Sequence, residues 1–162
     1  MFSESIRQTT TDLLDCYRRA GLKIATAESC TGGLVAAALT SIAGSSDVVE
    51  RGFVTYTNDA KEHQLGVPRL ALLSYGAVSE PVARAMAEGA LRESLADVAV
   101  SVTGIAGPGG ATPGKPVGLV HFGLARRGHP TVAEQHVFPG DRDSIRADAL
   151  TTALELLRRC AG

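Results

Sequence analysis

The stretch LKIATAESCTGGLVAAAL, residues 22–39, decides the fold class of this chain. Its first part, residues 22–27, is short and apolar, as expected of a buried strand. A polar turn with two glycines follows at 28–33, and an alanine-rich segment typical of a tightly packed helix covers 34–39. A buried strand that turns directly into a helix is the building unit of α/β proteins. The sequence therefore predicts a layered α/β fold that extends outward from this unit.

The alternation of strand-like and helix-like periods continues on both sides of this unit. Further strands are predicted at 48–56, 97–103, 117–125 and 131–138, longer helices at 3–20, 79–95 and 141–159, and short helical segments within 57–66 and 68–74. Gly21 stands where a left-handed helix cap is expected. Ser79 is the expected cap of its helix, with Pro81 in the first turn. Because no repeat, low-complexity tract or linker interrupts the pattern, we predict a single domain over residues 1–162.

The connections between these elements predict the topology of the sheet. Strands joined by a helix are expected to be parallel with right-handed crossovers, which applies to the first three strands. The turn RRGHP at 126–130 predicts a hairpin between the fourth and fifth strands. A mixed five-stranded sheet in the order 2-1-3-4-5, with strand 4 antiparallel, satisfies both conditions. Ligands of such sheets bind beyond the carboxyl ends of the strands, where the strand order reverses.

Composition and charge exclude several classes of protein. Lys and Arg number 16 against 17 for Asp and Glu, a net charge of -1, so the basic surface needed for non-specific nucleic-acid binding is absent from the sequence. No apolar run is long enough to cross a bilayer, and the first residues are too acidic and polar for a signal peptide. Three cysteines, Cys16, Cys30 and Cys160, form no close pair, which disfavours a disulfide framework or a zinc site. We expect a cytoplasmic protein with no membrane and no nucleic-acid partner.

The turn after the first strand is the first candidate for chemistry. A hydroxyl or thiol at a helix start, here Ser29 or Cys30, is well placed to act as a nucleophile. The neighbouring glycines, Gly32 and Gly33, let a ligand approach the backbone, whose free N–H groups favour an anion. The structural alternative is that Ser29 or Thr31 only caps the helix and that Cys30 is a small buried residue.

Tyr56 and Lys61 follow the second strand. Lys61 is one of three lysines in the chain, and a lysine beside a serine acts as a general base when burial lowers its pKa. The hydroxyl of Tyr56 can relay the proton or orient the amine. The alternative is a solvated lysine on a surface turn and a tyrosine packed over the end of a strand.

Two further segments lie at carboxyl ends of strands. The loop 104–116 begins with TGIAGPGG at 103–110, which lacks the spacing and the Lys-Ser/Thr ending of a P-loop, although long glycine-rich loops in small domains are usually functional. After the fifth strand, Arg142 is able to reach a phosphate or carboxylate. Helix capping by Asp141 and an exposed helical salt bridge of Arg146 are the structural alternatives. The histidines are scattered, and no metal-binding motif is present.

Four strings along the chain resemble the CinA C-terminal-domain family. They are TAESCTGG at 26–33, GFVTYTN at 52–58, GAVSEP at 76–81 and GIAGP at 104–108, and the similarity extends from about residue 5 to residue 158. The resemblance implies a three-layer α/β/α sandwich. It also implies hydrolysis of nicotinamide mononucleotide to nicotinate mononucleotide and ammonia, a step of pyridine nucleotide (NAD) recycling, without metal or cofactor. In full-length members of the family the same domain follows a larger N-terminal domain. The resemblance of this sequence covers the C-terminal domain alone, so we expect the stand-alone form.

The resemblance implies that Ser29, Tyr56 and Lys61 are catalytic. The residues then expected to contact the substrate are Glu28, Cys30, Thr31, Gly32, Gly33, Thr103, Gly104, Gly107, Arg142 and Arg146. Ser29 would attack the carboxamide carbon, and Lys61, directly or through Tyr56, would carry the proton. N–H groups of residues 30–33 would stabilise the oxyanion. The phosphate would be held by the loop 103–110 or by Arg142, and the sequence does not choose between them.

Two other functions are compatible with the same residues. One is a non-catalytic nucleotide-binding or interaction domain of a competence-related or damage-inducible protein, although neutral charge and few aromatic residues disfavour RNA. The other is an amidohydrolase for another pyridine or a small amide, because substrate choice depends on the shape of the pocket. We also expect a homo-oligomer, since the fifth strand lies at an exposed edge of the sheet.

Overall fold

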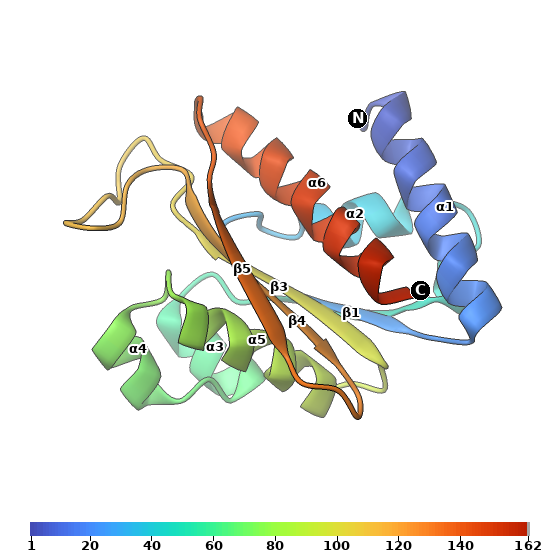
Figure 1. The fold of residues 1–162 in the computed structure, drawn as a ribbon, viewed down its shortest axis with the longest axis horizontal. Helices are drawn as coiled ribbons and strands as arrows, with labels where there is room; N and C mark the ends of the chain where they lie inside the picture. Colours follow the sequence, from blue (N-terminus) through green and yellow to red (C-terminus); the bar gives the residue numbers. More distant parts are fainter. Residues whose placement is uncertain (162) are drawn as a thin grey trace.

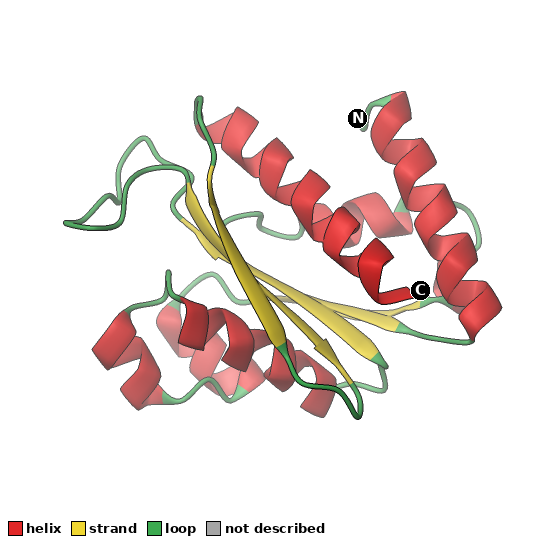
Figure 2. Ribbon diagram, in the orientation of Figure 1, coloured by secondary structure: helices red, strands yellow, loops and turns green. Residues whose placement is uncertain are grey.

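A twisted five-stranded sheet runs through the middle of the molecule (Figure 2). The computed structural model describes residues 1–161, so Gly162, the last residue of the predicted domain, lies outside the description. The strands are β1 (Ile24–Glu28), β2 (Val49–Val54), β3 (Val98–Gly104), β4 (Leu119–Arg126) and β5 (Val132–Val137). Their order is β2-β1-β3-β4-β5, with β1 parallel to β2 and β3, and β4 antiparallel to β3 and β5. The predicted order and the reversed fourth strand are confirmed.

Helices cover both faces of the sheet (Figure 1). One face carries α1 (Glu4–Ala20), α2 (Leu34–Thr40) and α6 (Arg142–Ala161), and the other carries α3 (Asn58–Leu65), α4 (Arg69–Tyr75) and α5 (Glu80–Arg92). A short 3₁₀ turn, Ser45–Asp47, precedes β2. The predicted α/β architecture with helix layers on both sides is therefore confirmed. Among the helices of residues 1–161, none has the length and apolar character needed to cross a bilayer.

The alternation of side chains along the strands divides the interior into two cores. On β3, Val98, Val100 and Val102 face α1 and α6, whereas Ala99 and Ser101 face α5. The α5 face is built from small residues, which allow the helix to lie close to the sheet. Because α5 lies close to the sheet and α3 packs against α5, residues of α3 come near the carboxyl ends of the strands.

Gly89 in α5 is a point of backbone contact that holds α3 in place. A Cβ atom built on Gly89 would lie 2.1 Å from the carbonyl oxygen of Leu65, the last residue of α3. Only glycine fits such an approach, since real Cβ contacts at this distance do not occur. The short helix α3 is thereby fixed against α5.

The expected helix 79–95 begins where predicted, with Ser79 in the N-cap position and Pro81 in the first turn, but the predicted cap hydrogen bond and the predicted end are wrong. Ser79 occupies the N-cap position, but its hydroxyl donates to the Gly76 carbonyl at 2.8 Å and caps no helical N–H, so the predicted serine cap is wrong. The helix ends at Arg92 because the Ser94 hydroxyl donates to the Ala90 carbonyl, the acceptor that the next helical turn would need. In contrast, the predicted helical turn within 57–66 is a full helix, α3, capped by the Thr57 hydroxyl.

Candidate active site

Ser29 and Lys61 form a buried pair at the carboxyl ends of β1 and β2. The amide of Ser29 donates to the Val102 carbonyl at 2.9 Å, which extends the pairing of β1 with β3 and turns the serine side chain to the α5 face. Lys61, in α3, brings its Nζ to 2.9 Å from the Ser29 Oγ. Lys61 is 1% exposed and Ser29 8%. The alternative considered from the sequence, a solvated lysine on a surface turn, is therefore wrong.

The surroundings of Lys61 favour a neutral amine. Its Nζ donates to the Thr55 carbonyl at 2.7 Å and lies 3.5 Å from the Tyr56 carbonyl, and no carboxylate in the described part of the chain pairs with it. Burial lowers the pKa of Lys61 to about 8, because the charged form loses its water. When the amine is neutral, two N–H groups face the carbonyls and the lone pair faces Ser29. The serine hydroxyl then donates to Lys61, as a general base requires.

The thiol of Cys30 is less suited to be the nucleophile. Cys30 is buried, and burial raises the pKa of its thiol to about 11, so the thiolate is scarce at neutral pH. The structure gives Lys61 a contact with the hydroxyl of Ser29, and it gives no such contact with Cys30 between residues 1 and 161. Of the two adjacent candidates, Ser29 is the one that faces a base.

The helix after the turn is capped by Glu28. The N-cap residue of α2, Gly33, supplies no side chain, and the two carboxylate oxygens of Glu28 instead accept from the amides of Val35 and Ala36 at 2.8 and 3.0 Å. The expectation that Ser29 or Thr31 caps this helix is therefore wrong. The hydroxyl of Thr31 is buried without a hydrogen-bond partner in residues 1–161.

The backbone of the turn leaves N–H groups free for an oxyanion. The Gly32 amide donates to the Ser29 carbonyl at 2.9 Å and is therefore occupied. In the described residues, the amides of Cys30 and Thr31 have no acceptor. Gly33 has a φ of 98°, a left-handed conformation that favours glycine and lets the chain enter α2 at once. Free amides beside a nucleophile are the components of an oxyanion hole.

Arg146 holds this turn from behind. From α6 it donates through Nε to the Cys30 carbonyl at 3.2 Å and through Nη2 to the Thr31 carbonyl at 3.1 Å. The expected alternative, an exposed helical salt bridge, is wrong. Because the N–H of a trans peptide points opposite to its C=O, a carbonyl held toward α6 turns the next amide away from α6. Arg146 thus orients the peptide groups that follow Ser29.

A cavity of about 280 Å³ opens over the Ser29–Lys61 pair. The predicted site residues that line it are Ser29, Cys30, Tyr56, Lys61, Thr103, Gly104, Gly107 and Arg142. The predicted contacts that do not line it are Glu28, Thr31, Gly32, Gly33 and Arg146, which build or support the turn. The sequence analysis missed Val78, which lines the cavity, and Thr55, whose carbonyl holds Lys61. The sequence carries no signal for either residue, because every residue has a backbone carbonyl and a valine that lines a cavity cannot be told from a valine of the core.

Tyr56 and Arg142 close one side of the cavity. The Tyr56 hydroxyl accepts from Arg142 Nη2 at 3.1 Å, and Arg142 Nη1 donates to the Gly107 carbonyl at 2.8 Å. The structure gives the Tyr56 hydroxyl no hydrogen bond to Lys61 or Ser29 within residues 1–161. The serine proton therefore has a direct route to Lys61. Arg142 links the loop after β3 to the segment after β2.

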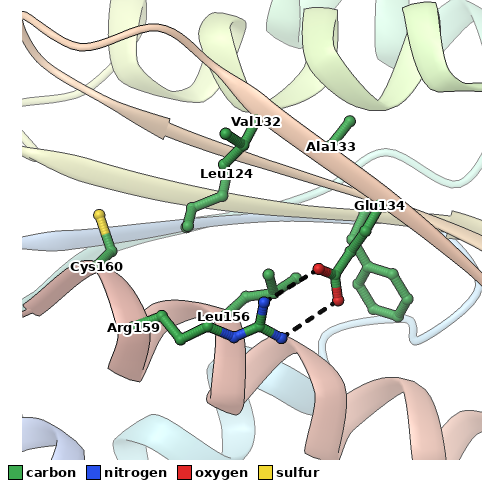
Figure 3. A pocket seen from close by; sticks show the side chains of 8 residues that line it. Leu124, Val132, Ala133, Glu134, Leu156, Arg159 and Cys160 are labelled. Carbon is green, nitrogen blue, oxygen red and sulfur yellow. Dashed lines mark hydrogen bonds and ion pairs between the residues drawn. The ribbon is translucent and has the colours of Figure 1, made fainter.

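A larger cavity, of about 430 Å³, lies between β4, β5 and the end of α6. Figure 3 shows its apolar walls and the ion pair of Glu134 with Arg159, 3.2 Å apart, at one side. Cys160 and Glu134 both line it, but Glu134 is paired with Arg159 and His136, and no hydrogen bond joins it to the thiol within residues 1–161. Between residues 1 and 161, no three His, Cys, Asp or Glu side chains gather where they could hold a metal ion. The chemistry that the described residues support thus lies at Ser29 and Lys61.

Comparisons with known proteins identify the family of the chain. The CinA C-terminal domain family profile matches residues 6–161. A CinA-like protein of Akkermansia muciniphila is 60% identical over 125 residues, covering 77% of this chain and 30% of the relative. A CinA-like protein of Citrifermentans bemidjiense is 48% identical over 159 residues, covering 98% of this chain and 38% of the relative. The chain thus spans about a third of the length of these curated relatives.

Solved structures resemble the chain over nearly its whole length. The crystal structure of a competence/damage inducible protein from Agrobacterium tumefaciens has a TM-score of 0.94 and 49% identity, and the match covers 97% of this chain and 96% of that chain. A competence-damaged protein (CinA) superfamily protein from Escherichia coli has a TM-score of 0.91 and 36% identity, with 97% and 92% covered.

Proposed function

Because this chain belongs to the CinA C-terminal domain family, we propose that it is an amidohydrolase that converts nicotinamide mononucleotide to nicotinate mononucleotide and ammonia. The observation that carries the proposal is the buried contact of 2.9 Å between Lys61 Nζ and Ser29 Oγ. A nucleophile hydrogen-bonded to a base of lowered pKa in a cavity is the arrangement that covalent amide hydrolysis needs.

The acylation half-reaction begins at Ser29. Its Oγ forms a bond to the carboxamide carbon while the hydroxyl proton moves to the neutral Lys61 amine. The carbonyl oxygen becomes an oxyanion, and the amides of Cys30 and Thr31, which have no acceptor in residues 1–161, would stabilise it. One well-placed donor of this kind contributes about 3 kcal/mol in related enzymes. The C–N bond then breaks, and Lys61 returns the proton to the leaving nitrogen, which departs as ammonia.

The deacylation half-reaction uses the same groups in reverse. Water replaces ammonia, gives a proton to Lys61 and attacks the ester carbon of the acyl-enzyme. The bond to Ser29 Oγ breaks, the oxygen recovers its proton from Lys61, and the product leaves as a carboxylic acid, which releases its proton to water and becomes the carboxylate. Ser29 and Lys61 end in their starting states, so the cycle needs no co-reactant other than water.

The burial of Lys61 favours an enzyme over a binding domain. A buried amine without a carboxylate partner lowers the stability of the folded protein, and such groups gather at active sites, where the shifted pKa is used. A protein that only binds a ligand does not need a lysine of lowered pKa in contact with a serine, whereas a hydrolase uses such a lysine as its base.

Ammonia release from nicotinamide mononucleotide tests the proposal, with and without EDTA. We expect turnover that EDTA does not change and that falls at least about 10³-fold in Ser29→Ala. The matched control is Cys30→Ala, which alters the adjacent side chain and should retain most of the activity. Folding of each variant is checked by thermal melting. A folded wild-type protein that releases no ammonia would overturn the proposed reaction.

A further inference from the structure

A row of polar side chains crosses the sheet beside the candidate active site. The register pairs Glu28 of β1 with Val102 of β3, so the next residues, Ser29 and Thr103, lie side by side. Thr103 is in turn paired with His121 of β4. All three side chains lie on the α5 face, because each continues the alternation of the small residues that pack there. Two spacings between neighbouring strands place His121 about 10 Å from Ser29.

His121 is buried without a partner. Its side chain is 8% exposed, and in residues 1–161 it forms no hydrogen bond or ion pair. It lines a second cavity, of about 380 Å³, which adjoins the first because Val78 lines both. Buried polar groups in folded proteins are normally hydrogen-bonded. The ring nitrogens of His121 are not among the fully buried unpartnered atoms of residues 1–161, so they open onto this cavity, where a ligand can reach them.

The rest of this second cavity suits an anion. The ammonium group of Lys115 lines it and uses one N–H for the Tyr75 carbonyl, which leaves two for a ligand. The 13-residue helix α5 begins beside this cavity at Glu80, after its N-cap residue Ser79, and has no side-chain cap. Pro81 carries no N–H, so the first turn offers the amides of Glu80 and Val82. The carboxylate of Glu80 also lines the cavity, but it is paired with Arg84 at 2.8 Å.

We propose that the cavity formed by His121, Lys115 and the start of α5 binds a phosphate group, and that this is the phosphate of the substrate hydrolysed at Ser29. The second half of this inference rests on the proposed function. An amide on the base of a mononucleotide and its phosphate lie at opposite ends of the molecule, as Ser29 and the His121 cavity do. Of the two groups expected from the sequence to hold the phosphate, Arg142 is hydrogen-bonded to the Gly107 carbonyl and the Tyr56 hydroxyl, and the loop 103–110 carries no cationic side chain.

The charge state of His121 offers a direct readout. Burial, together with the positive charge of Lys115, holds the pKa of His121 below its ordinary value, while Glu80 acts weakly in the opposite direction. The lowered pKa favours the neutral ring in the free protein. A bound phosphate favours the imidazolium, so its binding should raise the pKa of His121.

Titration with inorganic phosphate, followed by the NMR signals of the histidine rings, tests the site without any catalysis. We expect a saturable shift of the His121 signal and a raised pKa, with His129 of the exposed hairpin unaffected. Lys115→Met should weaken this phosphate affinity about tenfold or more. Equal small shifts of every histidine, or binding unchanged in Lys115→Met, would overturn the phosphate site.

Kinetics identify the source of the phosphate. The ratio of KM for nicotinamide mononucleotide to KM for its riboside, which lacks the phosphate, should rise about 10- to 100-fold in Lys115→Met and His121→Leu. His129→Gln is the matched control and should leave the ratio unchanged. If phosphate binds but the ratio does not move, the site takes a free anion and the substrate assignment is wrong. If neither amide is hydrolysed, the proposed function fails while the titration still decides the phosphate site.

Discussion

The Nζ of Lys61 lies 2.9 Å from the Oγ of Ser29, although 32 residues of sequence separate them. Ser29 is placed by the end of β1, and Lys61 by the helix that α5 holds against the sheet. The contact therefore depends on the packing of three elements. Its chemical value comes from burial, which lowers the pKa of Lys61 to about 8.

The activity should follow the deprotonation of Lys61. Below pH 8 the neutral amine is the minor form, so kcat/KM should fall about tenfold for each pH unit and reach a plateau above pH 8. Initial rates between pH 5.5 and 9.5 measure this profile. An activity that stays level from pH 6 to pH 9 would exclude Lys61 as the base.

Lys61→Met should separate activity from stability. Activity should fall by about 10²–10⁴-fold with loss of the base, yet the folded protein should become more stable at pH 7, because a buried charge without a carboxylate partner is removed. Thermal melting and ammonia release on the same sample measure both effects. A variant that melts earlier than wild type at pH 7 would contradict the stability half of the prediction.

The stability difference between wild type and Lys61→Met should depend on pH. The pKa of Lys61 is about 8 in the folded protein and 10.5 ordinarily, so between these values the unfolded chain binds more protons. The contribution of Lys61 to the free energy of unfolding of the wild type therefore rises from pH 8 to 10.5. Over the same range, the excess stability of the methionine variant over the wild type shrinks. Urea unfolding at pH 7 and pH 10 checks the sign, and a difference that grows with pH would refute it.

Arg146 should act on the rate rather than on substrate affinity. Arg146→Met removes two hydrogen bonds to the carbonyls of Cys30 and Thr31, so kcat should fall about tenfold or more with little change in KM. Arg146→Lys should restore only part of the rate, since an ammonium lacks the planar fork of arginine. Arg158→Met, on the exposed side of the same helix, is the control. An equal loss in Arg158→Met would point to general damage to α6.

Gly89→Ala should destabilise the protein and disturb the site together. The added Cβ would meet the Leu65 carbonyl at 2.1 Å, so α5 or α3 must move, at a cost of about 1–3 kcal/mol. Gly109→Ala is the control for stability, because its Cβ would meet nothing within 4 Å. Urea unfolding of both variants measures the difference, and equal stability would show that α3 is not held as described.

Much of the fold was predictable because its signals are local. The short apolar stretch of β1, the glycine turn and the helix α2 each involve a few consecutive residues, and handedness rules then order the sheet. The helix limits were less predictable, as at Arg92, where one serine hydroxyl competes with the backbone for an acceptor. The strand ends predicted that Ser29, Tyr56 and Lys61 gather at one edge of the sheet, and the family resemblance then implied that the three are catalytic.

The sequence by itself determined the class of fold, the order of the strands and the edge at which the reactive groups gather. Periodicity is a property of each short segment, and the connections between consecutive segments restrict how the strands can be ordered. Only the tertiary structure decided which of these groups touch. It paired Lys61 directly with Ser29, turned Tyr56 toward Arg142 and placed Arg146 behind the turn, 116 residues from Cys30 in sequence. Side-chain contacts and burial depend on how α3, α5 and α6 pack on the sheet, and burial is what makes a lysine a base.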